Sequence, residues 1–256
     1  MEAFYDAFAP SYHLIFADWD ASIARQGRVF ASIIESQWPG HRSLLDVSCG
    51  IGTQAIALAQ SGYWVKASDI SAVALERARA EAARRGLVIE FSVCDMRNAF
   101  ACHGGGFDVV LSADNSIAHL LDDDEVLRAL RAMFACLKPG GGCLLMVRDY
   151  DKEERGRNLV KPYGTRIEDG KRFLALQVWD FEGDRYNLTL HLIEEDLATG
   201  ATSVRTLRSR LYAISADRLL ALMQRAGFTR VQRLDEVFYQ PVLVGTRPLT
   251  ERSEID

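Results

Sequence analysis

The sequence predicts an α/β fold with a seven-stranded, mostly parallel sheet and an inserted antiparallel β-meander. Two observations carry this prediction. Between residues 43 and 150, short apolar runs alternate with amphipathic helical stretches, as they do in repeated βαβ units. After residue 150, strand-like runs follow one another with only short turns between them, which is typical of antiparallel strands. A chain of 256 residues is long enough to bury a substantial core in one such domain.

The first half of the chain supplies the parallel strands. They are expected at residues 43–47, 63–68, 87–93, 107–111 and 143–147. A glycine-rich turn and a helix from about Thr53 to Gln60 follow the first strand. Ser71 is placed to cap the next helix, which ends near Gly86, and Asp122 opens a helix that runs through Leu137 to a turn at residues 139–142.

The second half contains the meander and two closing strands. The meander strands are expected at residues 173–181, 186–193 and 204–214, and the closing strands near 228–234 and 241–246. Ser215 is placed to cap a helix that reaches about Arg225. We therefore expect a single domain over residues 1–256. Its parts are N-terminal aromatic lid helices (1–38), a cofactor-binding core (39–150), a β-meander insertion (151–214), and a closing helix with strands (215–247).

Composition and charge exclude several partners. Thirty Lys and Arg residues against 35 Asp and Glu give a net charge of −5 without a basic block, so nucleic acid is not expected as a partner. Acidic residues stand where a signal peptide would be basic, and no apolar run is long enough for a membrane span, which favours a cytoplasmic protein. The five scattered cysteines form no CxxC pair, so we expect reduced, mostly buried thiols and no metal site. The sequence is compatible with a monomer or a homo-oligomer.

A glycine turn after the first strand predicts a nucleotide-like cofactor. Residues 50–55 satisfy G-x-G-x-x-A, and Asp69 ends the next strand, which would also suit a dinucleotide. Asp46 discriminates, because a carboxylate at the tip of the first strand would repel a pyrophosphate and attract an α-ammonium group. S-adenosylmethionine carries such an ammonium and no phosphate. Asp69 would accept hydrogen bonds from its ribose hydroxyls. Asp95 would accept one from its adenine amine, or else only caps a turn.

Several motifs in order resemble those of class I S-adenosylmethionine-dependent methyltransferases over residues 43–150. They are Asp46–Thr53, Asp69, Asp95 and the Lys138–Gly141 turn. This resemblance implies a Rossmann-like methyltransferase fold with S-adenosyl-L-methionine as cofactor. Asp114–Leu120 and Val147–Asp151 look like the corresponding segments of glycine and glycine/sarcosine N-methyltransferases. The chain is also similar to the related azapteridine (toxoflavin-type) N-methyltransferase, and these motifs do not separate the two groups.

The resemblance and the strand ends together name a candidate site. The expected cofactor contacts are Asp46, Ser48, Gly50, Gly52, Asp69, Ile70, Cys94, Asp95, Met96, Ala113, Trp19 and Arg25. The expected catalytic residues are Asn115, His119, Arg148 and Tyr12. The expected substrate contacts are Tyr5, Phe16, Arg148, Trp179 and Phe181. In the resembling family the asparagine lies in the active site and the arginine grips a substrate carboxylate.

Each of these assignments has a structural alternative. The aromatic N-terminal residues form either a lid over the cofactor or the apolar face of a helix packed on the sheet. His119 is either a proton acceptor or a structural hydrogen-bonding partner. Arg148 either contacts the substrate or pairs with Asp149 or Asp151. Trp179 and Phe181 share one face of a strand, where a core role is the default.

The leading functional hypothesis is N-methylation of a small molecule, most simply a secondary-metabolite heterocycle such as an azapteridine. A glycine/sarcosine N-methyltransferase and a small-molecule O-methyltransferase are the alternatives with the same cofactor. A nicotinamide-dependent oxidoreductase is disfavoured by Asp46, and a non-catalytic cofactor-binding module by the complete active-site segments. Methyl transfer from a sulfonium is an in-line displacement that requires positioning rather than a metal.

Overall fold

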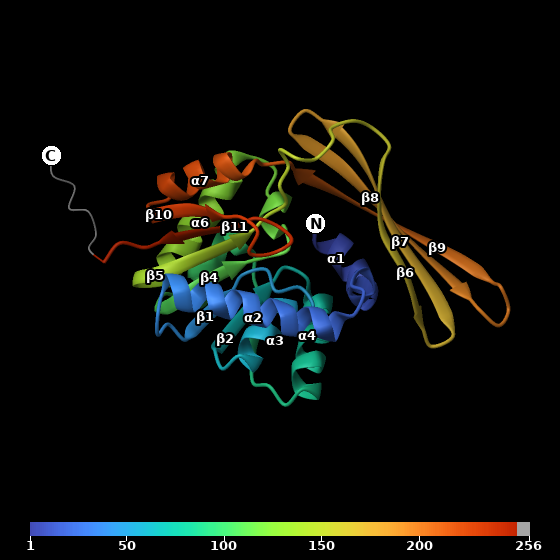
Figure 1. The fold of residues 1–256 in the computed structure, drawn as a ribbon, viewed down its shortest axis with the longest axis horizontal. Helices are drawn as coiled ribbons and strands as arrows, with labels where there is room; N and C mark the ends of the chain where they lie inside the picture. The colour runs from blue at the N-terminus through green and yellow to red at the C-terminus, as the bar shows by residue number, and fades with distance from the viewer. Residues whose placement is uncertain (250–256) are drawn as a thin grey trace.

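The computed structural model describes residues 1–249 and contains two sheets (Figure 1). The larger sheet has seven strands in the order β10-β11-β5-β4-β1-β2-β3, and the smaller has four in the order β6-β7-β8-β9. The strands of the larger sheet are β1 (Ser43–Asp46), β2 (Trp64–Asp69), β3 (Glu90–Val93), β4 (Phe107–Ser112), β5 (Leu137–Met146), β10 (Thr229–Leu234) and β11 (Val242–Thr246). The predicted fold class is confirmed. Residues 250–256 of the predicted domain lie outside the described residues.

The topology of the larger sheet determines where a ligand can bind. β1 pairs in parallel with β2 on one side and β4 on the other, and the strand order reverses between them. Ligands of open α/β sheets bind at such a reversal, outside the carboxyl ends of the strands. Only β11 runs antiparallel to its neighbours β5 and β10. Residues 139–142, predicted as a turn, instead lie within β5, where the pairing register with β4 shifts.

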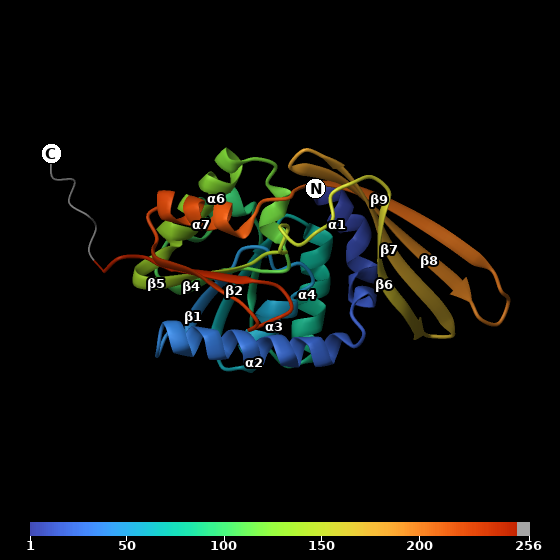
Figure 2. The same ribbon diagram turned by 45° about the horizontal axis from the view of Figure 1, so that its top comes forward.

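Helices cover both faces of this sheet (Figure 2). On one face lie α2 (Trp19–Gln37), α3 (Thr53–Gln60) and α4 (Ala72–Arg84), and on the other α6 (Asp123–Cys136) and α7 (Ala216–Arg225), with the short α5 (Ala99–His103) beside α6. The predicted caps are present, because the side chains of Ser71, Asp122 and Ser215 accept the backbone N–H three residues later. α2 is capped in the same way by Asp18, so its helix starts after a bend rather than continuing from residue 1.

The smaller sheet has four antiparallel strands, one more than predicted. They are β6 (Leu159–Glu168), β7 (Lys171–Glu182), β8 (Arg185–Asp196) and β9 (Thr202–Tyr212). The sequence does not reveal β6 because Pro162 and Gly164 interrupt it, and both residue types disfavour a strand assignment. The structure accommodates them at an edge, with a register shift between these two residues.

The N-terminal segment lies between the two sheets (Figure 1). It consists of α1 (Glu2–Phe8) and the 3-10 helix η1 (Ala9–Ile15), which contact α4 on one side and strands β6, β7 and β9 on the other. Phe4 and Phe8 are buried in the core that the two sheets share. The aromatic side chains of residues 1–16 are therefore held at the edge where the parallel strands end.

The cysteine prediction is wrong for one pair. Cys94, at the end of β3, forms a disulfide with Cys102 of α5 across an eight-residue separation, while Cys49, Cys136 and Cys143 are free and buried. No short-range motif marks this pair, because the 3-10 turn η2 (Met96–Asn98) and the helix between the two cysteines bring them together. His103 lies beside the pair, with ligand atoms of all three residues within 4.8 Å, but the two sulfur atoms are bonded to each other.

Candidate active site

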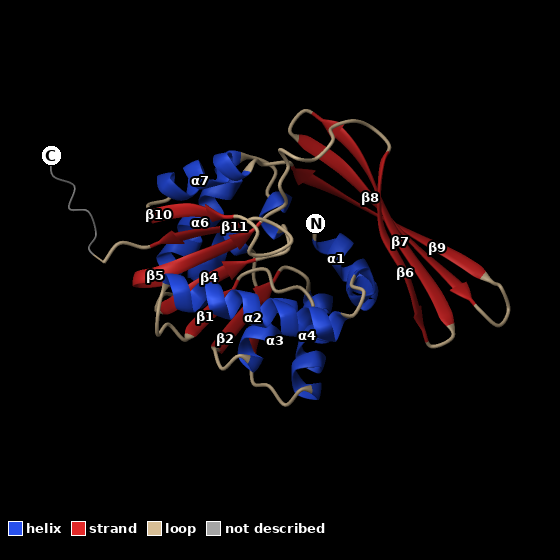
Figure 3. Ribbon diagram, in the orientation of Figure 1, coloured by secondary structure: helices blue, strands red, loops and turns tan. Residues whose placement is uncertain are grey.

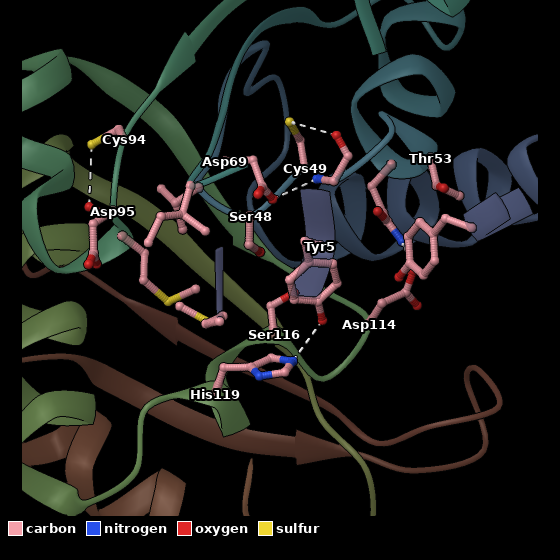
Figure 4. Close-up of a pocket in the computed structure, with 17 residues that line it drawn as sticks. Tyr5, Ser48, Cys49, Thr53, Asp69, Cys94, Asp95, Asp114, Ser116 and His119 are labelled. Carbon is pink, nitrogen blue, oxygen red and sulfur yellow. Dashed lines mark hydrogen bonds between the residues drawn. The ribbon is translucent and has the colours of Figure 1, made fainter. Parts of the chain in front are cut away.

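A first cavity opens at the carboxyl ends of β1, β2 and β3 (Figure 4). The predicted cofactor residues that line it are Ser48, Gly50, Asp69, Ile70, Cys94, Asp95 and Met96. Gly50 and Gly52 have φ values of +53° and +95°, in the left-handed region that favours glycine, and Gly52 is the N-cap residue of α3. The predicted glycine turn therefore brings backbone close to whatever occupies this cavity.

Asp69 connects the glycine turn to the end of β2. Its Oδ2 accepts the N–H of Gly50 at 2.8 Å, and its Oδ1 accepts the N–H of Ser71 at 2.9 Å. Each carboxylate oxygen has a further lone pair, so Asp69 can accept hydroxyl groups as well. Asp95 accepts the N–H of Arg97 at 2.9 Å and begins η2, so it caps a turn and lines the cavity at once.

Asp46 lies beneath this cavity rather than in its lining. The side chain is 1% exposed, Oδ1 accepts the N–H of Ser48 at 3.1 Å, and Oδ2 has no hydrogen-bonding partner. Burial raises the pKa of the Asp46 carboxyl to about 8. The described lining contains Asp69, Asp95 and Asp114 but no lysine or arginine. An unpaired buried acid and an acidic lining suit a cofactor with an ammonium group and would repel a pyrophosphate.

The other predicted cofactor residues lie outside the first cavity. Gly52 and Ala113 are buried behind it. The Trp19 indole N–H donates to Thr53 Oγ1 at 3.0 Å, and the Arg77 and Arg85 guanidinium groups lie over its ring. Arg25 is exposed and lines a second cavity instead. Trp19 therefore positions the start of α3 rather than covering the first cavity.

The second cavity has a volume of about 540 Å³ and lies between the N-terminal segment, the ends of β4 and β5, and the smaller sheet. The predicted residues that line it are Tyr5, Tyr12, Phe16, Asn115, His119, Arg148 and Trp179. Phe181 does not line it. Its ring packs instead on Tyr186, with centroids 5.0 Å apart, and on Trp179, at 6.3 Å. Phe181 thus supports the cavity wall from behind.

Four residues line both cavities: Tyr5, Tyr12, Asp114 and His119. Figure 4 shows the Tyr5 hydroxyl directed at His119, whose Nε2 lies 2.7 Å away. Burial, followed by the charge of the N-terminal amino group, lowers the pKa of His119 to about 4, so its ring is neutral near pH 7. Burial also raises the pKa of Tyr5, which keeps its hydroxyl protonated. Tyr5 therefore donates to a neutral imidazole where the cavities meet.

Arg148 is held over an aromatic ring by a carboxylate. Its Nη1 donates to Glu153 Oε1 at 2.9 Å, and Lys161 Nζ donates to the other oxygen of Glu153 at 2.7 Å. The guanidinium carbon of Arg148 lies 4.9 Å from the centroid of Trp179. The partner of Arg148 is thus Glu153 and not Asp149, which pairs with Arg233. The buried Nε of Arg148 has no hydrogen-bonding partner in the structure.

Comparisons with known proteins find similar methyltransferases. The family described as "Methyltransferase domain" matches residues 44–141. Glycine/sarcosine N-methyltransferase from Parasynechococcus marenigrum (strain WH8102) is 32% identical over 154 residues, which cover 60% of this chain and about half (54%) of the relative. The same enzyme from Halorhodospira halochloris is 26% identical over 207 residues, which cover 76% of this chain and 75% of the relative.

Solved structures share the architecture over most of its length. DesVI from Streptomyces venezuelae superposes with a TM-score of 0.77 at 21% identity, covering 89% of this chain and 92% of that protein. The sugar N-methyltransferase KedS8 from Streptoalloteichus sp. ATCC 53650 superposes with a TM-score of 0.75 at 25% identity, covering 88% of each chain. Residues 44–141 thus match a methyltransferase domain, and the chain is similar to class I S-adenosylmethionine-dependent methyltransferases. Its cofactor is S-adenosylmethionine, which the unpaired oxygen of Asp46 and the acidic lining fit.

Asn115 joins the ends of β4 and β5. Its Oδ1 accepts the N–H of Arg148 at 3.0 Å, and its Nδ2 donates to the Tyr150 hydroxyl at 2.7 Å. The Tyr150 hydroxyl in turn lies 3.1 Å from that of Tyr186 on the smaller sheet. With both polar groups engaged, Asn115 fixes the backbone next to Arg148, and its φ of +66° is one that asparagine tolerates.

Sequence reasoning missed several residues of the candidate site. Asp114, Tyr163 and Tyr239 line the second cavity, as do Glu153 and Gln177. Asp114 follows a parallel strand, a signal that could have identified it. Tyr163 lies on the strand that was not predicted, and Tyr239 comes from the loop after β10, which has no motif.

In residues 1–249 no helix is long and apolar enough to cross a membrane, and the cytoplasmic location stays a prediction.

Proposed function

We propose that this methyltransferase transfers the methyl group of S-adenosylmethionine to a nitrogen of a small, flat, polar molecule, a secondary-metabolite heterocycle such as an azapteridine. The observation that carries the proposal is the second cavity. Its volume of about 540 Å³ lies in the range of roughly 300–1,000 Å³ that small-molecule sites occupy, and it adjoins the cofactor cavity. A two-carbon amino acid would fill only a small part of it.

The walls of this cavity suit a planar ring with polar edges. The Arg148 guanidinium carbon and Lys161 Nζ lie 4.9 and 5.2 Å from the centroid of the Trp179 ring, and the Trp179 indole N–H donates to Gln177 Oε1 at 2.8 Å. Gln177 Nε2 donates to the Tyr163 hydroxyl at 2.9 Å. A ring stacked against such aromatic faces gains about 0.5–1.5 kcal/mol for each pair. The guanidinium fork of Arg148 can bind ring carbonyl oxygens as well as a carboxylate.

Nitrogen is the proposed nucleophile because of the relatives. The two relatives are, by name, glycine/sarcosine N-methyltransferases, and KedS8 is a sugar N-methyltransferase. The bound cofactor supplies a methyl group on a sulfonium. The residues of the chain exclude water and orient the acceptor nitrogen toward the first cavity at the boundary formed by Tyr5, Tyr12, Asp114 and His119.

Glycine is the second candidate, because Arg148 matches the carboxylate-binding arginine of the resembling family. Against it, Arg148 is already paired with Glu153, so a substrate carboxylate would have to displace an acid or lie beside it. An oxygen nucleophile is the third candidate, and the position of the new methyl group decides it.

Steady-state methylation tests the proposal. Glycine, sarcosine, pteridine-2,4-dione and pyrimidotriazinedione would be compared, with the methylated atom assigned by NMR. We expect N-methylation of a heterocycle, and Arg148→Ala should lower its kcat/KM by about tenfold or more. Arg155→Ala is the matched control, because Arg155 lies over Phe181 and pairs with Asp184 outside the cavity. Efficient turnover of glycine with inert heterocycles, or an O-methyl product, would refute the proposal.

A further inference from the structure

We propose that Asp114 accepts a hydrogen bond from the N–H of the substrate nitrogen during methyl transfer and then takes the proton. This inference rests on the proposed function, because it requires a nitrogen nucleophile. Asp114 belongs to the small group that lines both cavities, together with Tyr5, Tyr12 and His119 (Figure 4). The methyl group has to pass from the first cavity to the second at this boundary. Among the four shared residues, Asp114 is the only carboxylate.

The backbone and two neutral donors hold the carboxylate in place. Asp114 follows β4 with φ +51°, an uncommon conformation for a residue with a side chain. The Tyr239 hydroxyl donates to Oδ1, and Gln54 Nε2 donates to Oδ2 at 2.6 Å. Gln54 is itself held by Gln26, whose Oε1 accepts from the same nitrogen at 2.8 Å. Because each carboxylate oxygen has two lone pairs, one on each remains for a ligand.

No cation neutralises Asp114 among the ion pairs of residues 1–249. Three other acids of the site differ in this respect, since Asp95 pairs with Arg97, Asp149 with Arg233 and Glu153 with Arg148. Asp46 and Asp69 also have no ion pair in this part of the chain, but neither lines the second cavity. A carboxylate at a cavity boundary without a paired cation attracts an N–H donor or a positive charge. Methyl transfer places both at this boundary.

The chemistry balances with Asp114 as the acceptor. The nitrogen lone pair forms the new N–C bond while the C–S bond breaks, and sulfur keeps that electron pair. Positive charge moves from sulfur to nitrogen, and the nitrogen then loses its proton to the carboxylate, which releases it to water. His119 is the weaker acceptor, because its pKa is lowered to about 4 and its Nε2 already accepts from Tyr5. Burial raises the pKa of Asp114 and so strengthens its affinity for a proton.

Sinefungin provides a test that does not depend on turnover. It carries an amine where the cofactor carries the methylsulfonium, whereas S-adenosylhomocysteine carries neither methyl nor charge there. Calorimetry would give both dissociation constants for the wild type, Asp114→Asn, His119→Gln and Asp149→Asn. Asp149→Asn is the matched control, since Asp149 lines the second cavity but already pairs with Arg233 and Lys152.

We expect Asp114→Asn to raise the dissociation constant of sinefungin about 30-fold and that of S-adenosylhomocysteine less than threefold. The other two variants should leave the ratio of the two constants within threefold of wild type. An unchanged ratio in Asp114→Asn would overturn the inference and leave the proposed function standing. In turnover with an N–H heterocycle, Asp114→Asn should lower kcat about 100-fold and leave the KM for S-adenosylmethionine nearly unchanged, with partial recovery in Asp114→Glu. An O-methyl product would instead overturn the proposed function, whatever the ratio.

Discussion

Tyr5 and His119 are 114 residues apart in the sequence, yet the Tyr5 hydroxyl lies 2.7 Å from His119 Nε2. This contact fastens the N-terminal helix over the end of β4. The cofactor cavity below it has a volume of only about 40 Å³, with Met1, Tyr5 and Tyr12 in its lining. The release of a bound cofactor past these residues is therefore expected to depend on how firmly the Tyr5–His119 contact holds the N-terminal segment.

Tyr5→Phe should therefore accelerate the release of S-adenosylhomocysteine. The lost hydrogen bond is worth about 0.5–1.5 kcal/mol, which corresponds to roughly a twofold to thirteenfold faster dissociation if it must break before release. Stopped-flow fluorescence would measure the rate. Tyr63→Phe, which removes a hydroxyl at the start of β2 away from both cavities, is the control. Equal rates in Tyr5→Phe and wild type would show that this contact does not fasten the segment.

Asp69→Ala should weaken S-adenosylmethionine binding by about 1.5–3 kcal/mol, through the loss of charge-assisted hydrogen bonds. The carboxylate also accepts the N–H groups of Gly50 and Ser71, so the variant loosens the glycine turn. Asp69→Asn retains one acceptor oxygen for Gly50 or Ser71, so it should loosen the turn less than Asp69→Ala does. Unchanged affinity in calorimetry of both variants would remove Asp69 from the cofactor site.

Asp46 should make stability depend on pH without cofactor. Its pKa is raised from 3.8 to about 8, so the folded protein holds this proton more tightly than the unfolded chain. The stability contributed by the proton is complete below pH 4 and is lost as the pH rises toward about 8. The melting temperature of Asp46→Asn should exceed that of the wild type by an amount that grows between pH 5 and 8.5. Parallel pH profiles for the two proteins would contradict this.

Asp46→Asn should also weaken S-adenosylmethionine binding and leave adenosine binding unchanged, since only the former carries an ammonium group. Calorimetry with both ligands distinguishes this pairing from a purely structural role. An equal loss of affinity for both ligands would assign Asp46 to the scaffold.

Thiol labelling should detect the disulfide. Denatured protein treated with iodoacetamide without a reductant should gain three labels, on Cys49, Cys136 and Cys143. After reduction it should gain five, because Cys94 and Cys102 become available. Mass spectrometry counts the labels, and Cys102→Ser, which frees Cys94, should gain four without a reductant. Five labels in unreduced wild-type protein would show that the pair is not bonded.

Local sequence determined much of this protein. Hydrophobic runs with the right periods predict the seven strands of the larger sheet, and Ser71, Asp122 and Ser215 mark helix starts because their side chains satisfy nearby N–H groups. The glycine turn and Asp69 also follow from short-range patterns, since a tight turn requires positive φ at Gly50 and Gly52. These features depend on neighbours a few residues away, which is why the sequence reveals them.

Tertiary structure decided what the sequence leaves open. Asp114 shares the cavity boundary with Tyr5 and His119, the Glu153 carboxylate holds Arg148, and Cys94 meets Cys102. Each relationship depends on how separate elements pack. The edge strand β6 exists because β7 supplies hydrogen-bonding partners to a segment whose proline and glycine argue against a strand. Long-range packing sets such contacts, and no local pattern encodes a distance between elements that meet only in the folded chain.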